Sequence, residues 1–482
     1  MKSIWSESYN IKHRESLRGD IQVEAIVVGA GITGLLNAYM LKSKGIDVVV
    51  IERGKVLSGN TKNTTAKITI QHDLIYNKII KEFGEENAKD YAYANTLALE
   101  SYKKIVEENN IDCDFEEKDA YIYSLNNPEK IIKEYEAAKK IGIDVELLDK
   151  IELPFEIAKA LKFNHQAQFN PVKFLNFIAK DLKIYENTKA IDIKEGIVIT
   201  DKGEIKANHI VVATHFPIVN FPGYYFLRMH QDRSYVIAYD NAQKLNGMYI
   251  DENENGYSFR NYKDLLLIGG GSTRTGGNIH GGCYDEIREY KKKTYPNAKE
   301  KYTWSAQDCM PSDGIPLIGL YSKDMANVYV ATGFNKWGMT TAMASAIILS
   351  DMIVGKENTF AKIFSPDRFD ITASIKNFLE DMGETVYNFI AQKVNIPLQT
   401  IEYVKNGTGE IVIYNGEKVG VYKDNEGNAY TVSTKCPHLG CELKWNPDDL
   451  SWDCPCHGSR FDYKGNFLNS PTIKDLRHEE ES

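Results

Sequence analysis

The sequence lacks a hydrophobic segment of the length that crosses a membrane. No apolar run reaches about 18 residues, the length at which a transmembrane helix is expected. The N-terminal stretch, Met1 to Ser8, contains neither an apolar core nor a pair of arginines, so it does not have the pattern of a secretory leader. We therefore expect a cytoplasmic protein without a transmembrane segment.

An excess of positive charge is also absent. The 482 residues include 58 lysines and arginines against 67 aspartates and glutamates, and the formal net charge is −9. This balance argues against nucleic acid and against an anionic membrane as partners. The contents of 43% hydrophobic and 26% charged residues are ordinary for a globular protein, and the length suits two or three domains.

Cysteine is rare, yet four of the seven cysteines lie close together near the C-terminus. Cys436 and His438 form a Cys-x-His pair, and Cys454 and His457 form a Cys-x-x-His pair. A Rieske-type [2Fe–2S] cluster needs two such pairs, because it binds one iron through two thiolates and the other through two imidazoles. A zinc ion with two cysteine and two histidine ligands is the alternative.

This segment resembles the Rieske domains of respiratory complexes. In that type two further cysteines form a disulfide over the cluster, which implies a bond between Cys441 and Cys456. The resemblance also implies that Ser459 donates a hydrogen bond to a cluster sulfur, which raises the reduction potential. A second donor, usually a tyrosine, is replaced by Phe461. In a reducing compartment such a disulfide requires burial.

The residues before these ligands predict a small β-domain that runs from about 401 to 482. Alternating apolar residues flank Asn415-Gly416, a dipeptide that strongly favours a tight hairpin turn. The stretch 371–400 is charged and partly periodic at the helical repeat. We expect it to be a helical connector.

A second pattern, near the N-terminus, is typical of a dinucleotide-binding fold. The apolar run Ala25 to Val28 precedes the loop Gly29-Ala30-Gly31-Ile32-Thr33-Gly34 and an apolar helix. Glu52, followed by Arg53, closes the next strand at the spacing from which an acidic side chain meets a ribose hydroxyl. The glycines admit a pyrophosphate to the backbone at the helix N-terminus.

Two later segments indicate which dinucleotide binds. The strand-like run Val328 to Thr332 leads into Gly333-Phe-Asn-Lys-Trp-Gly338 and an alanine-rich helix from Met339 to Met352. This arrangement and the loop 58–67 resemble the D-amino-acid oxidase and sarcosine oxidase type of FAD-dependent oxidoreductase. The resemblance implies that the loop passes beside the isoalloxazine. It also implies that the helix N-terminus faces the flavin pyrimidine, where its dipole stabilises reduced flavin.

The resemblance implies a set of FAD contacts and a division of the chain. The candidate contacts are Gly29, Ala30, Gly31, Thr33, Gly34, Glu52, Arg53, Thr64, Thr65, Ala66, Gly333, Gly338, Met339 and Thr340. The expected fold is an α/β Rossmann-like FAD-binding domain with an inserted α+β substrate domain, together 1–370, and a C-terminal all-β Rieske domain. FAD-binding segments at about 20–70, 150–220 and 301–355 would alternate with substrate-domain segments at about 71–150 and 221–300.

The substrate site is less well marked. Four arginines are candidates to bind a substrate carboxylate, although each also suits a solvated surface position: Arg228, Arg233, Arg260 and Arg274. Cys309 lies near the point where sarcosine oxidases attach FAD through a thioether, and the alternative is a buried free thiol. No catalytic base is assigned.

The two cofactors together suggest three functions. A flavin accepts two electrons and can release them singly, whereas the cluster holds one. The first hypothesis is a dehydrogenase that oxidises an amine or amino acid and passes electrons through the cluster to an electron carrier or quinone-like acceptor. The second is a reductase whose electrons enter through the cluster and reduce an organic substrate. The third is a non-enzymatic electron-transfer or redox-sensing protein.

Overall fold

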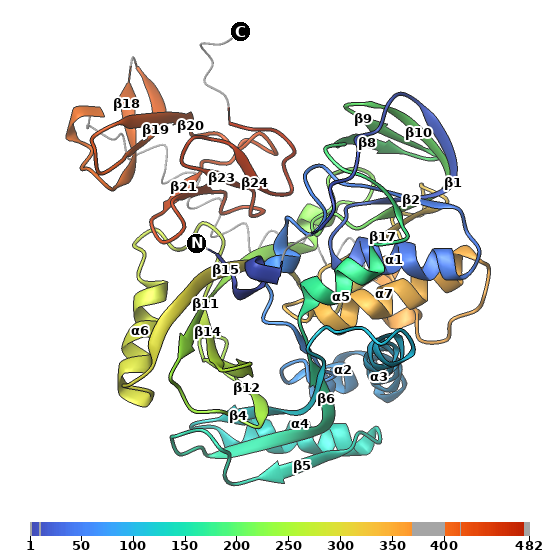
Figure 1. The fold of residues 1–482 in the computed structure, drawn as a ribbon, viewed down its shortest axis with the longest axis vertical. Coiled ribbons are helices and arrows are strands. Elements are labelled where there is room, and N and C mark those ends of the chain that lie inside the picture. The colour runs from blue at the N-terminus through green and yellow to red at the C-terminus, as the bar shows by residue number, and fades with distance from the viewer. Residues whose placement is uncertain (1, 9–10, 369–400, 415, 477–482) are drawn as a thin grey trace.

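The computed structural model describes residues 2–8, 11–368, 401–414 and 416–476. Two large sheets with their helices make up the first 368 residues, and two small sheets make up the C-terminal domain, residues 401–476 (Figure 1). The expected helical connector at 371–400 lies outside the described residues. Within the described ranges, no helix is long and apolar enough to span a membrane.

The first sheet has the parallel centre that the glycine-rich loop predicts. Eight strands are described: β1 (Ile21–Val28), β2 (Val48–Ile51), β7 (Lys183–Tyr185), β8 (Ala190–Lys194), β9 (Ile197–Thr200), β10 (Gly203–Val212), β16 (Leu317–Leu320) and β17 (Val328–Thr332). Their order is β16-β17-β10-β1-β2-β7, with β9 on β10 and β8 on β9. The pairs from β17 through to β7 are parallel. Such a sheet is expected to be covered on both faces.

Because side chains alternate along a strand, the two faces of β1 pack into two different clusters of buried hydrophobic residues. Ala25 and Val27 are fully buried in a cluster that includes residues of α1 (Ile32–Ser43), α3 (Glu85–Glu108), α5 (Pro171–Ile178) and α7 (Gly338–Ile353). Ile26 and Val28 belong to a second cluster on the opposite face, which contains no residue of these helices. The helices therefore cover one face of the first sheet, as the view in Figure 1 also shows.

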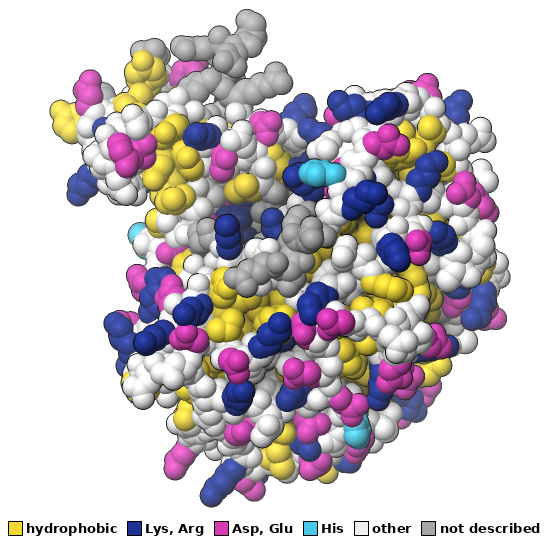
Figure 2. All heavy atoms as spheres, in the orientation of Figure 1, with side chains coloured by type: hydrophobic (Ala, Val, Ile, Leu, Met, Phe, Trp, Pro, Cys, Tyr) yellow, Lys and Arg dark blue, Asp and Glu magenta, His cyan; other side chains and the backbone are white. Residues whose placement is uncertain are grey.

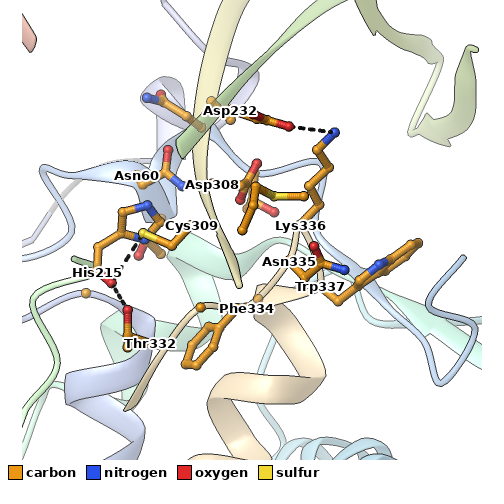
Figure 3. A pocket seen from close by; sticks show the side chains of 18 of the residues that line it. Asn60, His215, Asp232, Asp308, Cys309, Thr332, Phe334, Asn335, Lys336 and Trp337 are labelled. Atoms are coloured by element: carbon orange, nitrogen blue, oxygen red, sulfur yellow. Dashed lines mark hydrogen bonds and ion pairs between the residues drawn. The ribbon is translucent and has the colours of Figure 1, made fainter. Parts of the chain in front are cut away.

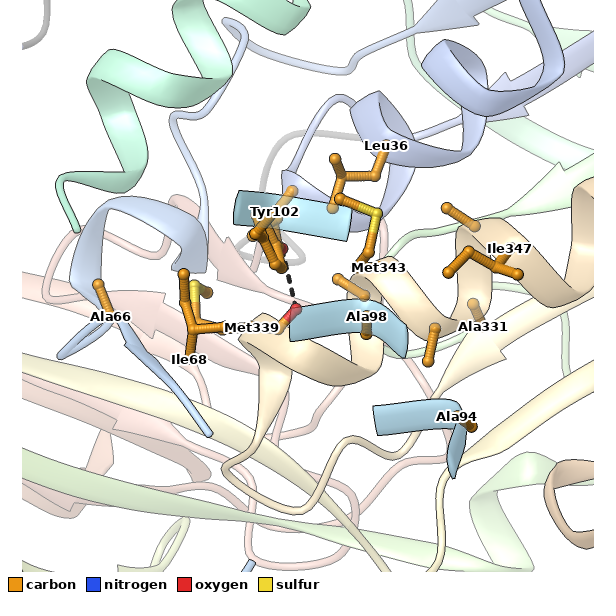
Figure 4. Close-up of a cluster of buried hydrophobic side chains, with 14 of the residues drawn as sticks. Leu36, Ala66, Ile68, Ala94, Ala98, Tyr102, Ala331, Met339, Met343 and Ile347 are labelled. Atoms are coloured by element: carbon orange, nitrogen blue, oxygen red, sulfur yellow. Dashed lines mark hydrogen bonds between the residues drawn. The ribbon is translucent and has the colours of Figure 1, made fainter. Parts of the chain in front are cut away.

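Small side chains let α7 pack closely against its neighbours. Nearly every described residue of α7 is buried, as expected for a helix that is apolar on all sides. Ala98 of α3 and Leu36 of α1 lie against it (Figure 4). The Tyr102 hydroxyl of α3 donates a hydrogen bond to the Met339 carbonyl oxygen over 2.9 Å. This bond fixes the first turn of α7, which faces the cavity described below.

The second sheet is mixed and mostly antiparallel. Its described strands are β3 (Lys67–Ile68), β4 (Glu116–Ser124), β5 (Val145–Leu148), β6 (Lys159–Gln168), β11 (Met229–Asp240), β12 (Gly247–Asp251), β13 (Ser258–Tyr262), β14 (Leu265–Arg274) and β15 (Lys299–Pro311). Their order is β15-β11-β14-β13-β12-β4-β6-β3, with β5 on β6. Helices α2 (Ile75–Phe83), α4 (Pro128–Lys140) and α6 (Cys283–Thr294) connect or flank these strands.

The second sheet takes strands from segments that were expected to bind FAD. β6 lies inside the expected segment 150–220, and most of β15 lies inside 301–355. The division by sheet therefore differs from the expected boundaries at 150 and 301. Sequence pattern locates a strand but does not say which sheet it joins, because strand pairing depends on residues far away in the chain.

The C-terminal domain consists of two small antiparallel sheets. One contains β18 (Gly409–Tyr414), β19 (Glu417–Lys423) and β20 (Ala429–Ser433); the other contains β21 (Lys444–Asn446), β22 (Ser451–Asp453), β23 (Arg460–Asp462) and β24 (Phe467–Asn469). Tyr414 pairs with Glu417, so β18 and β19 form the hairpin that the sequence predicts. The all-β prediction for this domain is confirmed.

A buried group of charges joins the C-terminal domain to the second sheet. The Asp449 side chain, 4% exposed, accepts hydrogen bonds from Arg233 of β11 and from Arg460 of β23. Ser305 of β15 donates to the same carboxylate over 2.9 Å. Burial raises the pKa of Asp449, but the two guanidinium charges outweigh this and hold the pKa below its ordinary value. Asp449 therefore stays ionised between its two partners.

Most other charges lie at the surface. Basic and acidic side chains are intermixed over the face shown in Figure 2. In a pair such as Lys89 and Glu86 the carboxylate side chain is 85% exposed, so solvent screens the attraction and the pair contributes little to stability. The Asp449 group differs because its members are removed from water.

We expect Asp449→Asn to lower the free energy of unfolding by about 3 kcal/mol, because it leaves the buried Arg233 without its anion. Denaturant unfolding of the full-length protein, followed by circular dichroism, measures this change. The control Glu86→Gln alters only an exposed pair and should change stability by less than about 0.5 kcal/mol. Equal stabilities of the two variants would contradict the role given to Asp449.

Candidate cofactor site and metal centre

A cavity of about 780 Å³ is lined by residues of both large sheets and of the C-terminal domain. Eleven of the fourteen candidate FAD contacts line it: Gly29, Ala30, Gly31, Thr33, Glu52, Arg53, Thr64, Thr65, Gly333, Gly338 and Met339. The other three, Gly34, Ala66 and Thr340, do not line it. The wall also contains Leu468, Asn469, Ser470 and Ile473, which the sequence did not lead us to expect.

The glycine-rich loop forms an anion-binding end of this cavity. α1 has no acidic residue in its first turn, and although the Ile32 N–H donates to Thr61 Oγ1 over 3.0 Å, the next N–H groups of this turn can bind an anion. Gly29 has φ 110°, and a Cβ there would lie 2.6 Å from the Ala213 carbonyl oxygen. A Cβ on Gly34 would lie 1.8 Å from the Gly29 carbonyl oxygen, so this third glycine allows helix and strand to pack.

Glu52 lies beside the glycine-rich loop at the end of β2. Its Oε2 accepts a hydrogen bond from the Ala30 N–H over 3.0 Å, and its Oε1 accepts one from the Gly54 N–H over 2.8 Å. This is the place at which the ribose of a dinucleotide would bind. The neighbouring Arg53 lies 3.6 Å from the ring centroid of Phe467 in β24. The C-terminal domain therefore touches the nucleotide end of the cavity.

Three buried side chains hold the loop 63–66 at another part of the wall. Trp304, Trp5 and Arg260 donate hydrogen bonds to its four carbonyl oxygens in succession, over 2.6–2.8 Å. Nearby, α7 begins with no side-chain cap and no acidic residue in its first turn. Its dipole and free N–H groups therefore face the cavity, as expected for a helix at the flavin pyrimidine.

Charged side chains of the second sheet and of the loop before α7 lie on one part of the cavity wall (Figure 3). A carboxylate oxygen of Asp232 lies 3.9 Å from the Lys336 Nζ. Burial raises the pKa of Asp308 to about 6. Burial, with the nearby Arg260 charge, lowers the pKa of Lys67 to about 7. The cavity thus combines acidic groups with amines, an arrangement that suits a small polar substrate.

The four candidate arginines do not line the cavity. Arg233 pairs with Asp449, and Arg260 holds the loop 63–66. Arg228 donates to the Pro366 carbonyl oxygen over 3.0 Å, and Arg274 is exposed. The structure therefore does not support the prediction that they bind a substrate carboxylate. The lysines that line the cavity are Lys67, Lys78, Lys189 and Lys336.

Cys309 lines the cavity, as a thioether link to FAD would require. Its single S–H proton can be donated to the His215 carbonyl oxygen, 3.5 Å from Sγ, or to Gln231 Oε1, 3.7 Å from Sγ. Burial raises the pKa of the thiol well above its ordinary value, so little reactive thiolate is present. These features favour the buried free thiol over the covalent link.

The four expected cluster ligands lie together in the C-terminal domain. The thiols of Cys436 and Cys454 are buried and hydrogen-bonded to each other. The rings of His438 and His457 have centroids 5.0 Å apart, and the Nδ1 atom of each is buried without a partner among the described residues. A bound metal would satisfy these nitrogens. Burial lowers the pKa of His438 to about 4, so the imidazole is in the neutral form that binds metals.

This arrangement suits two metal ions better than one. Among the described residues, the sulfurs of Cys441, Cys454 and Cys456 form the one group of three potential ligands that lie within 4.8 Å of one another. Cys441 and Cys456 cannot act as thiolates there, because they form a disulfide with an S–S distance of 2.10 Å. The cysteine pair and the histidine pair do not converge as the four ligands of a tetrahedral zinc would.

The disulfide that the resemblance implies is present. Both of its cysteines are only half-buried, so the burial expected for it is incomplete. Ser459 is fully buried and hydrogen-bonds to Cys436. Its Oγ also accepts a hydrogen bond from the Thr472 N–H over 3.1 Å, which orients the hydroxyl so that its proton can point to sulfur.

Sequence reasoning missed the contacts of the cluster loops with the first 368 residues. His438 Nε2 hydrogen-bonds to Asn220 Oδ1 over 2.7 Å. Phe226 packs edge-on against both ligand histidines, with centroid distances of 6.3 and 5.7 Å. Gln231 Nε2 donates to the His457 carbonyl oxygen over 2.6 Å. These partners lie more than 200 positions from the cluster loops, and no local motif marks them.

The chain belongs to the FAD-dependent oxidoreductase family, since residues 24–352 match the family model described as FAD dependent oxidoreductase. Residues 395–479 match the model of the Rieske [2Fe-2S] domain. The chain is 37% identical over 493 residues to YhfW of Bacillus subtilis (strain 168), which is named as a Rieske 2Fe-2S iron-sulfur protein. That alignment covers 99% of this chain and 97% of YhfW.

Two solved structures resemble almost three quarters of the chain. Glycine oxidase from Geobacillus kaustophilus has a TM-score of 0.61 at 19% identity, covering 72% of this chain and 99% of that one. L-proline dehydrogenase from P. horikoshii has a TM-score of 0.61 at 20% identity, covering 73% and 98%. At this identity the likeness shows the fold.

The protein is therefore an oxidoreductase that binds FAD and a Rieske [2Fe–2S] cluster, and the zinc alternative is set aside. We propose that Cys436, His438, Cys454 and His457 are the cluster ligands. We also propose that the glycine-rich loop, Glu52, the loop 63–66 and the first turn of α7 hold FAD.

We expect Ser459→Ala to lower the reduction potential of the cluster by roughly 60 mV, because the lost hydrogen bond stabilises the reduced, more negative cluster by about 1.4 kcal/mol. Redox titration monitored by electron paramagnetic resonance (EPR) measures the potential. Ser451→Ala is a matched control, since Ser451 is equally buried but donates to Asp453. A potential unchanged in Ser459→Ala, or lowered equally in both variants, would exclude this role.

Proposed function

We propose that the protein is a dehydrogenase that oxidises an amine or amino acid at FAD and passes the electrons through its own Rieske cluster to an external acceptor. The observation that supports this proposal best is that both domains build one cavity. Leu468, Asn469, Ser470 and Ile473 of the Rieske domain line the same cavity as the proposed FAD contacts. The two proposed cofactor sites would thus be adjacent within one chain.

This adjacency bears on the choice between dehydrogenase and oxidase. FAD takes a hydride from a C–N centre and can give up its electrons one at a time to a one-electron centre. Because the cluster domain forms part of the cavity wall, such a centre would be held beside the proposed flavin site within the same chain. Transfer to it needs no diffusing carrier, whereas molecular oxygen must reach the flavin from solution. The arrangement therefore favours a dehydrogenase.

The cavity supports a small substrate that carries an amino group and a carboxylate. The Lys67 Nζ lies 3.1 Å from Thr65 Oγ1 and 3.5 Å from Ser258 Oγ, so a carboxylate there could meet an amine and two hydroxyls. Asp308 and Asp232 line the same cavity and can orient an amino group. The structurally similar glycine oxidase and L-proline dehydrogenase carry names that refer to amino acids, in line with this substrate class.

The acceptor that we propose is an electron-carrier protein or a quinone-like molecule. It would approach the cluster at the loop that carries His438. The next residue, Leu439, is 47% exposed, so this loop is open to a partner on one side. The other side is occupied by Asn220 and Phe226.

Anaerobic stopped-flow absorbance with glycine, L-proline, sarcosine and other N-methyl amines tests the proposal. We expect the flavin bands to bleach first and the cluster bands to follow. If no compound bleaches the flavin, while an organic acceptor reoxidises dithionite-reduced protein, the reductase hypothesis replaces the dehydrogenase.

A pH dependence tests the role of Lys67. Lys67 is protonated below its pKa of about 7 and neutral above it, so a carboxylate should bind more weakly as the pH rises through 7. We expect the dissociation constant of acetate or benzoate, read from the flavin spectrum, to rise up to about tenfold per pH unit above pH 7. These ligands lack an amine whose own titration would interfere.

The variant Lys67→Met should bind these carboxylates weakly at every pH. The control Lys189→Met removes another lysine of the cavity wall, next to Thr188, and should keep the pH dependence. The same pH profile in Lys67→Met and in the unaltered protein would rule out Lys67 as the carboxylate partner.

A further inference from the structure

Strands β11 and β15 form the partition between the two cofactor sites. Asp232 of β11 pairs with Asp308 of β15, and both line the FAD cavity. Side chains alternate between the two faces of a strand, so the preceding residues, Gln231 and Gln307, point to the other face. Both contact the Rieske domain there. This part of the sheet therefore lies between the flavin cavity and the cluster loop, while Leu468 to Ser470 and Ile473 of the Rieske domain reach the cavity directly.

Gln231 links a cavity residue to a proposed cluster ligand. Cys309 is the cross-strand partner of Gln231 and also lines the cavity. Its Sγ lies 3.7 Å from Gln231 Oε1, to which its proton can be donated. Gln231 Nε2 in turn donates to the His457 carbonyl oxygen over 2.6 Å and to the Ser470 carbonyl oxygen over 2.8 Å. The residue is 1% exposed, so water does not compete for these bonds. One amide thus spans the distance from the cavity wall to the cluster loop.

Gln307 makes a second link of the same kind. Its Nε2 donates to the Gly458 carbonyl oxygen over 2.7 Å. Its backbone is bonded on both sides to Asn60, which lines the cavity: the Gln307 N–H donates to Asn60 Oδ1 over 3.0 Å, and Asn60 Nδ2 donates to the Gln307 carbonyl oxygen over 2.7 Å. Gln307 is fully buried.

Gly458 is what allows both amides to reach the cluster loop. Its φ is 83°, and a Cβ at this position would lie 2.6 Å from Gln231 Cβ and 2.9 Å from Gln307 Nε2. A larger residue would push the two side chains away. The close approach therefore depends on a glycine directly after the ligand His457.

We propose that Gln231 and Gln307 are positioning residues that couple FAD to the Rieske cluster for electron transfer. The proposal rests on the proposed exchange of electrons between the two cofactors and assigns its route. In each transfer the reduced flavin loses one electron and one ferric iron of the cluster becomes ferrous. Two transfers, with the external acceptor reoxidising the cluster between them, remove the two electrons of one hydride, and the protons go to solvent.

The physical reason lies in electronic coupling. Coupling for electron transfer falls less steeply across covalent and hydrogen-bonded atoms than across a van der Waals gap. The amide hydrogen bonds of 2.6 and 2.7 Å end on the backbone of His457 and Gly458, within one residue of a proposed iron ligand. Replacing either amide with an apolar group leaves a gap in the route.

The experiment compares full-length holoprotein with Gln231→Leu, Gln307→Leu and the double variant. Anaerobic laser flash photoreduction with 5-deazariboflavin and EDTA injects electrons, and absorbance follows their redistribution between flavin and cluster. We expect the rate constant of redistribution to fall about tenfold in each single variant, which is about 1.4 kcal/mol in activation free energy. The fall should be larger in the double variant. Cluster EPR g values and both reduction potentials should stay unchanged, which a general disturbance of the cluster would not allow.

Asn278→Leu is the matched control. Asn278 is also a buried amide at the domain interface, where it donates to Asn446 and Asp448 of the Rieske domain over 3.2 and 2.9 Å, away from the cluster loop. It should leave the rate constant unchanged. An unchanged rate constant in the glutamine variants, or an equal fall in Asn278→Leu, would overturn the proposal.

A second variant and the use of photoreduction allow a folding defect, and a failure of the proposed function, to be distinguished from a failure of the role given to the glutamines. If Gln231→Leu does not fold, Gln231→Met keeps about the length of the side chain and removes the N–H that donates to His457 without adding a charge, and it should slow redistribution as well. Photoreduction needs no substrate. Failure of every amine to bleach the flavin would therefore contradict the proposed function without touching the result for Gln231 and Gln307.

Discussion

The hydrogen-bonded pairing of β11 with β15 holds the two redox sites in a fixed relation. Their register places Asp232 opposite Asp308 on the cavity side and Arg233 opposite Gln307 on the side of the Rieske domain. Because side chains alternate with a period of two, a slip of one residue in either strand would exchange the two sets. The cavity would then receive the residues that dock the cluster domain. The cavity wall and the surface that docks the Rieske domain are thus two faces of one structural element.

The contact between the domains depends on polar groups that are satisfied in pairs. Asp449 lies between Arg233 and Arg460, and Asp448 accepts from the Gly282 and Cys283 N–H groups over 3.2 and 2.9 Å. Burying charges is costly unless each finds its partner, so only a narrow range of orientations is stable. An apolar interface would tolerate sliding. The polar one fixes the cluster loops against the second sheet.

Much of the architecture could be predicted from the sequence, because each motif that marks it lies within a short stretch of the chain. The strand, glycine loop, helix and acid of the nucleotide site lie within residues 21–52, and the cluster ligands lie within residues 436–457. Each motif is a complete physical unit in which spacing alone sets the geometry. The hairpin of β18 and β19 follows from its turn dipeptide in the same way.

The parts that could not be predicted depend on contacts between distant segments. Arg260 has the same chemistry whether it binds a substrate or holds the loop 63–66, and only the fold decides. The assignment of β6 and β15 to the second sheet requires knowledge of their pairing partners. The Gln231 contact with His457 joins positions 226 residues apart, and an isolated glutamine in a strand carries no signal of such a role.

The residues of the Rieske domain that line the cavity affect the order in which the cavity wall is completed during translation. Leu468 to Ser470 and Ile473 follow every other residue of the cavity wall in the sequence, so they are the last part of that wall to leave the ribosome. Until they emerge, every other part of the cavity wall has already been synthesised and is open on that side. The flavin thus has a period during translation in which it can enter freely, and folding of the iron–sulfur domain ends that period.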